Sequence, residues 1–134
     1  MTAPEIKEVF QNYPLGLLLQ GQSDVKKIEK SLNKGHCLAA FDGDGVVGVY
    51  VLRDMKDGSA EILNIAVIET ARGKGLGKAL LDDARNRAAN DGYGKLIVTI
   101  ENDAAARQFF EQNGFAVDAD AETPDGFARL FRSL

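Results

Sequence analysis

The sequence predicts an α+β domain with one mixed sheet flanked by helices, and three observations predict it. The 134 residues are 45% hydrophobic without any apolar run of about 18 residues, as expected of one globular domain with a core. Short apolar runs separated by Asp-Gly steps indicate antiparallel strands. A strand, a helix and a second strand then follow between residues 60 and 101, and this order predicts a right-handed crossover between parallel strands.

The first half of the chain predicts two helices followed by three strands. The helices are expected over residues 3–12 and 23–35, with Ser23 as a possible cap and Gly35 as the stop of the second. Two antiparallel strands joined by a tight turn are expected next, and a turn at "MKDGSA" leads to the third strand. These three strands span residues 37–41, 46–53 and 60–67.

The second half alternates helices with strands. A helix over residues 75–90 carries Leu76, Leu80, Ala84 and Ala88 on one face. A second helix is expected to end at Asn113-Gly114, because this pair favours a helix C-terminus. The remaining elements are a strand over 94–101, the helix over 102–114 and terminal strands over 114–117 and 127–132, and the whole order is ααββ(β)αβαββ.

Composition excludes several classes of function. The net charge of −4 argues against nucleic acid as a partner, because phosphate binding needs a basic face. "LGLLL" is too short for a signal peptide, so a cytoplasmic location without membrane attachment is expected. Cys37, the lone cysteine, forms no internal disulfide, and with His36 alone beside it no metal site is expected; Cys37 is interpreted as a small core residue.

The stretch "NIAVIETARGKGLGKALLDDA", residues 64–84, passes from a strand through a glycine-rich turn into a helix. The dinucleotide fingerprint fails because Lys78 and Leu80 stand where its last glycine belongs, and the Walker loop fails at Arg72 and Ala79. Unpaired amides at a helix start bind anions, and glycines let a phosphate approach the backbone. An anion site is therefore predicted, with a flexible cationic loop as the alternative.

This turn, with the order of elements around it, resembles the GNAT superfamily of N-acetyltransferases. The family's acetyl-CoA signature R/Q-x-x-G-x-G/A matches the run from Arg72 to Gly77. Upstream, "ILNIAV" is similar to the family's bulged fourth strand, and "NDAAARQFFEQNGF" is similar to its N-x-x-A-x-x-x-Y-E-x-x-G-F segment. The resemblance covers residues 36–116, and it leaves the family's first strand either missing or reduced to "LGLLL".

The resemblance implies a single acyl-CoA N-acyltransferase domain over residues 1–134, with splayed parallel strands and acetyl-CoA as co-substrate. The pyrophosphate would lie on the turn, and the pantetheine arm would run along the preceding strand and meet Asn102, for which a helix N-cap is the alternative role. The implied cofactor-binding residues are Ile65, Ala66, Val67, Arg72, Gly73, Lys74, Gly75, Leu76, Gly77, Lys78 and Asn102.

The resemblance also implies the chemistry, which is acyl transfer from a thioester to an amine. Glu61 matches the spacing of the catalytic glutamate in histone-type members and is the candidate base, with a polar residue on a solvated sheet face as the alternative. The amide of Ala66 or Val67 would bind the oxyanion. Phe110 replaces the family's tyrosine acid, so water or another hydroxyl would protonate the thiolate; Tyr50 and Tyr93 are substitutes, with core packing as the alternative.

Two functions are weighed on these grounds. The first is an N-acetyltransferase that moves an acetyl group from acetyl-CoA to a primary amine by direct attack in a ternary complex. The second is a non-catalytic acyl-CoA-binding module that has lost the acid. The acceptor is expected to be an amine of a small molecule, peptide or protein, and a homodimer is compatible with the sequence.

Overall fold

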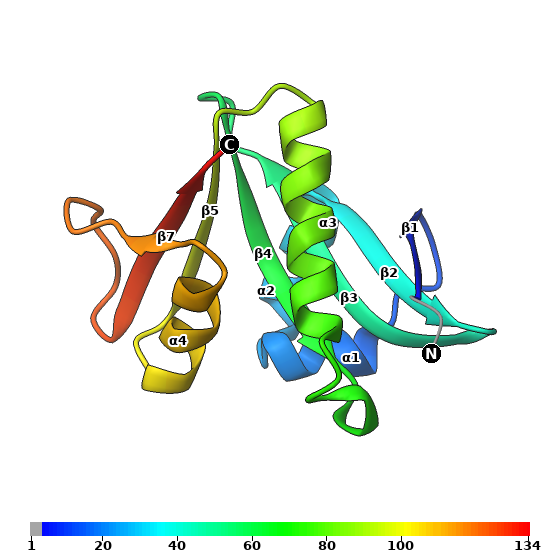
Figure 1. Ribbon diagram of the computed structural model, residues 1–134. Coiled ribbons are helices and arrows are strands. Elements are labelled where there is room, and N and C mark those ends of the chain that lie inside the picture. Colours follow the sequence, from blue (N-terminus) through cyan, green and yellow to red (C-terminus); the bar gives the residue numbers. More distant parts are fainter. Residues whose placement is uncertain (1–3) are drawn as a thin grey trace.

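Seven strands form one mixed sheet in the computed structural model, which describes residues 4–134 (Figure 1). The strand order across the sheet is β1-β2-β3-β4-β5-β7-β6, and all neighbours are antiparallel except β4 and β5. The strands are β1 (Glu5–Val9), β2 (His36–Asp42), β3 (Gly45–Asp54), β4 (Ser59–Val67), β5 (Lys95–Glu101), β6 (Ala116–Val117) and β7 (Phe127–Ser133).

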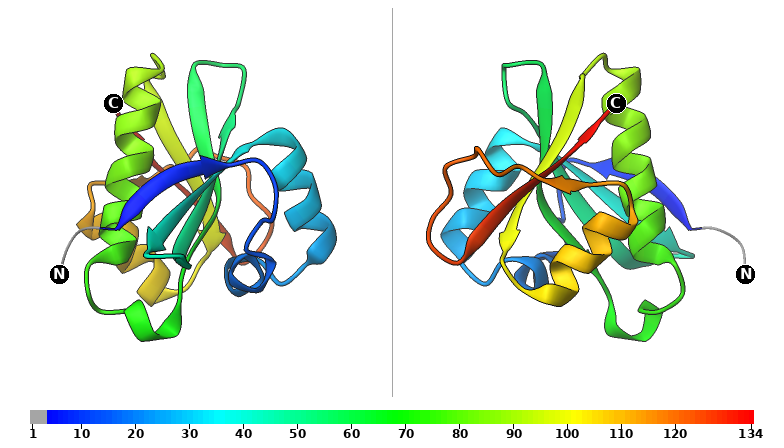
Figure 2. Two further views of the ribbon diagram at one scale, coloured as in Figure 1. Left: turned by 90° about the vertical axis from the view of Figure 1, so that its right-hand side faces the viewer. Right: turned by 60° about the vertical axis from the view of Figure 1, so that its left-hand side comes forward.

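Helices cover both faces of this sheet, as Figures 1 and 2 show. The helices are α1 (Leu15–Gly21), α2 (Val25–Lys34), α3 (Leu76–Asn90) and α4 (Ala104–Gln112), and a 3-10 turn, η1 (Glu69–Ala71), precedes α3. The larger apolar cluster lies beneath α3 and α4 and includes Leu80, Leu96 and Leu130. The smaller cluster joins α1 and α2 to the opposite face through Leu18 and Ile28. Among residues 4–134, no helix is long and apolar enough to cross a membrane.

The parallel pair β4 and β5 separates along its length. The two strands pair from Ser59–Lys95 to Ile62–Val98, and each then continues without the other. In Figure 1 they lie together at one end and spread apart at the end where α4 and the η1 turn are found. β4 also carries a bulge against β3 at Leu63, between the pairs Val51–Asn64 and Leu52–Ile62.

Most predicted elements downstream of residue 23 are confirmed. The hairpin between β2 and β3 turns at Asp42–Gly45, and Gly43 adopts the left-handed φ of 63° there. The helix expected over 75–90 spans Leu76–Asn90, and Gly35 ends α2. Ser23 does not cap α2, because the side chain of Asp24 accepts the Lys26 amide instead.

The helix predicted over residues 3–12 is wrong. From Glu5 to Val9 the chain is an edge strand, paired from Glu5–Phe41 to Val9–Cys37; Ala3 lies outside the described residues. Ile6 packs against the larger cluster and Val9 against the smaller, on opposite faces of the sheet. Two residues three positions apart share one face of a helix but lie on opposite faces of a strand. Pairing with β2 therefore determines the conformation of this segment.

The alternative interpretation of "LGLLL" as a reduced first strand is also wrong. This segment begins helix α1, which buries Leu17 and Leu18 and exposes Leu15 and Leu19. The first strand that the resemblance implies is β1, and it lies before α1 in the chain.

Candidate active site

The glycine-rich turn presents unpaired amides at the start of α3. Gly73 and Gly75 adopt left-handed φ values of 77° and 82°, which only glycine takes without strain. The first intrahelical bond is from the Ala79 amide to the Gly75 carbonyl, so the helix amides before Ala79 have no helical partner. The amide of Arg72 donates to the Glu69 carbonyl at 3.2 Å. The free amides therefore begin after Arg72, and together with the helix dipole they suit an anion.

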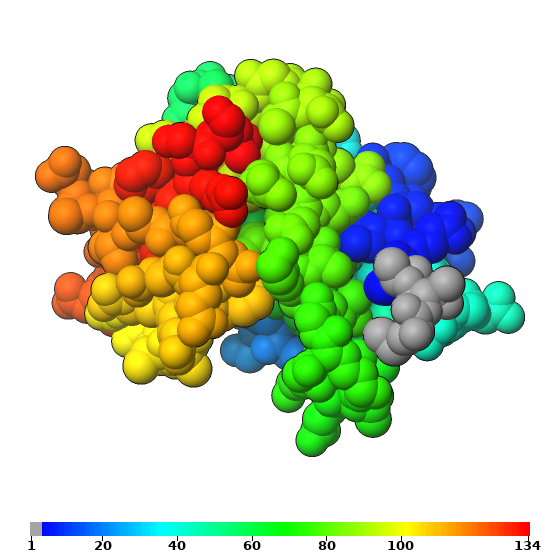
Figure 3. Space-filling view, in the orientation of Figure 1, coloured from blue at the N-terminus to red at the C-terminus, as the bar shows by residue number. Residues whose placement is uncertain are grey.

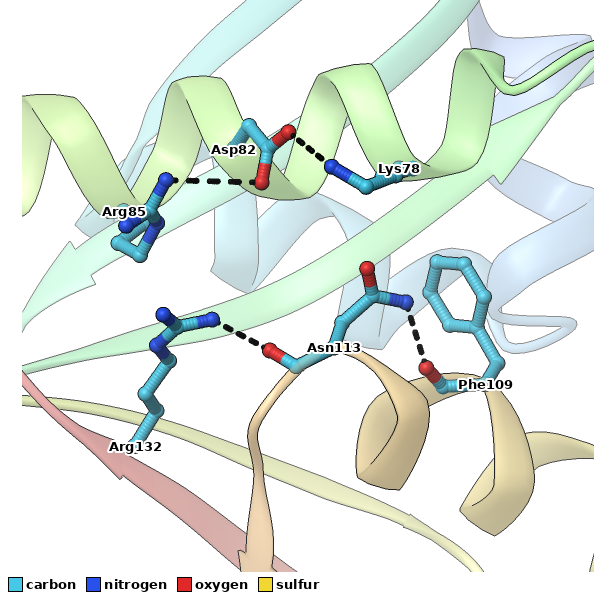
Figure 4. Close-up of polar contacts among 6 residues, drawn as sticks. All are labelled: Lys78, Asp82, Arg85, Phe109, Asn113 and Arg132. Atoms are coloured by element: carbon cyan, nitrogen blue, oxygen red, sulfur yellow. Dashed lines mark hydrogen bonds and ion pairs between the residues drawn. The ribbon is translucent and has the colours of Figure 1, made fainter.

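The cations of this turn have different surroundings. Arg72 donates from its guanidinium to the Val67 carbonyl at 3.3 Å and to the Gln20 side chain at 2.9 Å, so it ties the end of β4 to α1. Lys78 forms an ion pair with Asp82 at 2.8 Å within α3 (Figure 4). Lys74 has no ion pair among residues 4–134, which leaves its ammonium available near the turn.

A groove of about 490 Å³ connects this turn to α4. Gly77 forms one side, and a Cβ atom added there would lie 3.3 Å from the Phe109 ring, so the absence of a side chain lets α4 approach. On the other side, Asn113 closes α4 by donating to the Phe109 carbonyl at 2.7 Å, and Arg132 of β7 donates to the Asn113 carbonyl (Figure 4).

A larger cleft, of about 640 Å³, lies where β4 and β5 separate. Its walls are Ile62–Ile65 of β4 and Val98–Glu101 of β5, with the end of α1, the α1–α2 connection, α4 and Phe127 around them. In the space-filling view the surface is hollowed between α4 and the start of α3, with the α1–α2 region visible in blue behind it (Figure 3). The cleft therefore links the two faces of the sheet.

The backbone of β4 alternates between pairing with β3 and facing this cleft. The Ile68 amide donates to the Val47 carbonyl, and the register then makes Ala66 a hydrogen-bonded partner of Val49. The polar groups of Ile65 and Val67 point the other way, toward the separated strand. The Val67 carbonyl is already bonded by Arg72, so both groups of Ile65 and the Val67 amide remain for a ligand.

Glu61 lies on β4 just before the strands separate. It is 9% exposed, and its register neighbours are Arg53 on β3 and Ile97 on β5. Burial raises the pKa of this carboxyl, while the charges of Arg129 and Arg53 oppose the shift. Glu61 is thus buried, not on a solvated face. It lies one residue outside the walls of the cleft, next to Ile62.

Asn102 does not cap α4. The cap is Asp103, whose side chain accepts the amides of Ala105 and Ala106 at 2.8 and 3.3 Å. Asn102 is exposed beyond the end of β5, and its side-chain oxygen has a long contact of 3.4 Å with Arg107. The capping role expected as an alternative is therefore wrong, and the side-chain amide of Asn102 is exposed to solvent.

The aromatic candidates for the acid are separated from the cleft. Tyr50 is fully buried under α3, where its hydroxyl donates to Asp83 at 2.6 Å, and burial with this bond raises its pKa. Tyr93 follows α3, and its amide donates to the Ala88 carbonyl. Phe110 lines the cleft, with its ring packed edge-to-face on Phe109 and Phe115. The side-chain hydroxyls that do line the cleft are those of Ser23 and Thr99.

Other titratable groups offer little for covalent or metal chemistry. Cys37 is 3% exposed on β2, as its interpretation as a core residue requires, and burial raises the pKa of its thiol to about 11. It does not line the cleft. Within residues 4–134, no three His, Cys, Asp or Glu side chains lie together in a way that would hold a metal ion.

Sequence patterns alone did not single out Asn64 and Gly21, which face one another across the cleft wall. Asn64 is 5% exposed and donates from its side-chain amide to the Leu18 carbonyl at 3.0 Å. A Cβ atom added to Gly21 would lie 2.0 Å from the Asn64 side-chain oxygen. The only signal in the sequence was a polar residue inside the apolar strand "ILNIAV".

Comparison with known proteins places this geometry in a family. A family model for the Acetyltransferase (GNAT) family matches residues 4–115. An uncharacterised N-acetyltransferase of Bacillus subtilis (strain 168), YvbK, is 33% identical over 108 residues, which are 80% of this chain and 68% of that protein.

Solved structures agree in fold. A Bacillus subtilis acetyltransferase in complex with CoA has a TM-score of 0.86 and 27% identity, over 98% of this chain and 99% of that one. A GNAT family acetyltransferase from Elizabethkingia anophelis with acetyl-CoA bound has a TM-score of 0.89 and 24% identity over the full length of both chains. At that identity the second likeness concerns the fold alone.

Proposed function

Because this chain belongs to the GNAT family of acetyltransferases, we propose that it moves an acetyl group from acetyl-CoA directly to a primary amine within a ternary complex. The observation that carries this proposal is the cleft between β4 and β5, which runs along Ile62–Ile65 beside a buried carboxylate, with the turn of free amides following the end of β4. Residues 1–134 would then work as one acyl-CoA N-acyltransferase domain, in the cytoplasm.

The cofactor would enter the cleft from the α3 end. Its pyrophosphate would lie on the free amides of the turn from Gly73 onward, within the predicted run from Arg72 to Gly77, near Lys74 and Lys78. The pantetheine arm would follow β4, where the unpaired groups of Ile65 and Val67 act as the edge of a strand. Asn102, which follows β5 between the cleft residues Glu101 and Asp103, would have to turn its side chain toward the arm to meet it. The thioester then lies toward Ile62 and Val98, where the cleft closes.

The transfer would proceed in one covalent exchange. The amine lone pair attacks the thioester carbon, the C–N bond forms, and the carbonyl oxygen becomes an oxyanion near the Ile65 amide, which faces the cleft whereas the Ala66 amide faces β3. The C–S bond then breaks. The amine proton passes to Glu61 through water, because Glu61 lies just outside the cleft wall, and water or Thr99 protonates the thiolate.

Direct transfer is favoured over a covalent acyl-enzyme. A relay would need a nucleophilic thiolate in the cleft, and Cys37 is buried on another strand with a raised pKa. Double-reciprocal plots of initial rates, with both substrates varied, should therefore give intersecting lines, whereas parallel lines would indicate a covalent intermediate.

The alternative function is a non-catalytic acyl-CoA-binding module. It is favoured by Phe110, which stands where the family has a tyrosine.

Thiol release from acetyl-CoA with a panel of amines tests the proposal. We expect release to depend on an added amine, and Glu61→Gln to lower the maximal rate by about 10² to 10⁴ while CoA affinity stays unchanged. Glu101→Gln is the matched control, because Glu101 is an exposed carboxylate of the same cleft. CoA binding without release for any amine class, including polyamines, amino acids and peptide N-termini, would favour the binding module.

An amine of a small molecule, peptide or protein fits the proposal, and a homodimer is compatible with it. Nucleic acid and membranes are not proposed as partners, because the chain carries a net charge of −4.

A further inference from the structure

The half-buried guanidinium of Arg129, on β7, has no ion pair among residues 4–134. Its Nε atom is buried without a hydrogen-bond partner. Its two terminal nitrogens also lack a partner within these residues but are not buried, so a ligand can reach them. A partly desolvated guanidinium gains most from a carboxylate, which accepts two parallel N–H bonds.

Arg129 stands at the edge of the cleft, on the α1 and α2 side of the sheet. Its neighbours Ala128 and Leu130 pack with the larger cluster beneath α3 and α4, so the Arg129 side chain is directed to the opposite face. In the register of the sheet Arg129 pairs with Thr99 of β5, and Phe127 precedes it by two residues on the same face. Both of these neighbours line the cleft.

Glu61, the proposed base, lies on the same face as Arg129. Its neighbours Ala60 and Ile62 pack with the larger cluster, and Glu61 pairs with Ile97, two residues before the partner of Arg129 on β5. Burial raises the pKa of Glu61, and the charge of Arg129 opposes this shift more than that of any other group. The two side chains nevertheless form no ion pair, so opposite charges lie near each other with room for a ligand that carries both.

The other carboxylates of the cleft give weaker grounds for a polycationic acceptor. The side chains of Asp24 and Asp103 cap α2 and α4, so they already accept helix amides. Glu101 is exposed, and Lys27, which lines the same cleft, offsets its charge.

We propose that Arg129 binds a carboxylate of the acceptor, so that this protein acetylates free amino acids; the inference rests on the proposed acetyltransferase function. An amino acid carries an ammonium and a carboxylate, which match Glu61 and Arg129. The ammonium loses one proton to Glu61 through water, and the neutral amine attacks the thioester carbon. The C–N bond forms and the C–S bond breaks. Nitrogen loses two protons in all, of which one ends on the CoA thiol and the other in the solvent, while the carboxylate stays on Arg129.

Thiol release with paired acceptors tests this bond. Leucine with leucinamide and methionine with methioninamide differ at the carboxylate, and the accompanying difference in amine pKa cancels when each acceptor is compared between wild type and variant. We expect Arg129→Gln to lower kcat/KM for the amino acids by about 10- to 100-fold, chiefly through a higher KM, and to change it little for the amides. Arg129→Lys keeps the charge without the planar fork, so its loss should be smaller and again confined to the amino acids.

Arg53→Gln is the matched control, because Arg53 is the direct cross-strand partner of Glu61 but does not line the cleft. It should affect an amino acid and its amide alike, through the charge near Glu61. An equal loss for both acceptors in Arg129→Gln and in Arg129→Lys would overturn the inference and leave the proposed function intact. So would a wild type that releases thiol with polyamines or peptide N-termini but with no amino acid. If no amine supports release, the proposed function fails, and this inference with it.

Discussion

Glu61 illustrates how burial at one residue links catalysis to stability. A carboxylate on a central strand is costly to ionise, and the shift in its pKa is upward because burial outweighs Arg129 and Arg53. A raised pKa suits a general base, because the pKa of its conjugate acid is then closer to the pH range in which amines begin to lose protons. The same shift means that the ionised form weakens the folded state.

The sign of this effect gives a prediction. The folded protein holds the Glu61 proton more tightly than the unfolded chain, so the free energy of unfolding should fall as the pH rises from the ordinary value of 4.5 through the raised pKa. Glu61→Gln cannot ionise, so its stability should approach that of the wild type below pH 4.5 and exceed it at higher pH. Urea denaturation at several pH values measures both proteins.

Glu101→Gln controls for the loss of one negative charge from the cleft. The free energy of unfolding of Glu101→Gln, relative to that of the wild type, should not rise with pH as that of Glu61→Gln does. If the difference between wild type and Glu61→Gln stays constant with pH, Glu61 is not penalised on ionisation in the folded state.

At the scale of elements, the segment from β3 to α4 could be predicted because local signals agreed there. Asp-Gly turns, alternating strands and a capped helix each indicated the same boundaries, and Gly43, Gly75 and Gly114 adopt positive φ where turns were expected. The N-terminus lacked such agreement. β1 is five residues long and owes its conformation to pairing with β2, whereas "LGLLL" has no period that separates helix from strand.

The site was predictable to the extent that its residues follow one another in the sequence. The turn from Arg72 to Gly77 lies within one strand-turn-helix unit, and its unpaired amides follow from that unit alone. The burial of the Asn64 side-chain oxygen does not follow from one such unit, because it depends on the contact with Gly21 of α1. Likewise, the bonds of Arg72 to Val67 and Gln20 depend on how α1 packs, which the order of residues in the turn does not reveal.

The turn itself gives a prediction about the cofactor. Replacement of Gly75 by Val should weaken CoA binding at least tenfold, about 1.4 kcal/mol, because a side chain would block close approach of the pyrophosphate. In the free protein no atom lies within 4 Å of a Cβ there, so the structural cost comes from the φ of 82° alone. Calorimetry measures the affinity.

Gly58 provides the matched control for that strain. It has a φ of 88° and equally open surroundings, but it belongs to the turn between β3 and β4, far along the sheet from the α3 start. Gly58→Val should lose stability as Gly75→Val does and keep its CoA affinity. Unchanged affinity in a folded Gly75→Val protein would remove the anion site from the turn.

On the scale of the whole molecule, the sheet consists of two parts joined by a short seam. β1 to β4 form one antiparallel part and β5, β7 and β6 the other, and only four residue pairs of β4 and β5 connect them. α3 packs on one face of β3, β4 and β5 (Figure 1), and α1 lies on the opposite face, where Asn64 donates to the Leu18 carbonyl and Arg72 to the Gln20 side chain. A pantetheine arm in the cleft would extend the seam by replacing the missing strand contacts.

Cofactor binding should therefore protect the β4 side of the cleft from amide hydrogen exchange. We expect CoA to slow exchange at Ile65 and Val67, whose amides face the cleft, while Ala66 changes little because it already pairs with Val49. At 100 times its dissociation constant, CoA should also raise the free energy of unfolding by about 2.7 kcal/mol. NMR exchange rates with and without CoA measure the first effect, and urea denaturation measures the second. Protection limited to the turn at residues 73–78 would mean that CoA binds through its pyrophosphate alone, with the thioester outside the cleft and away from Glu61.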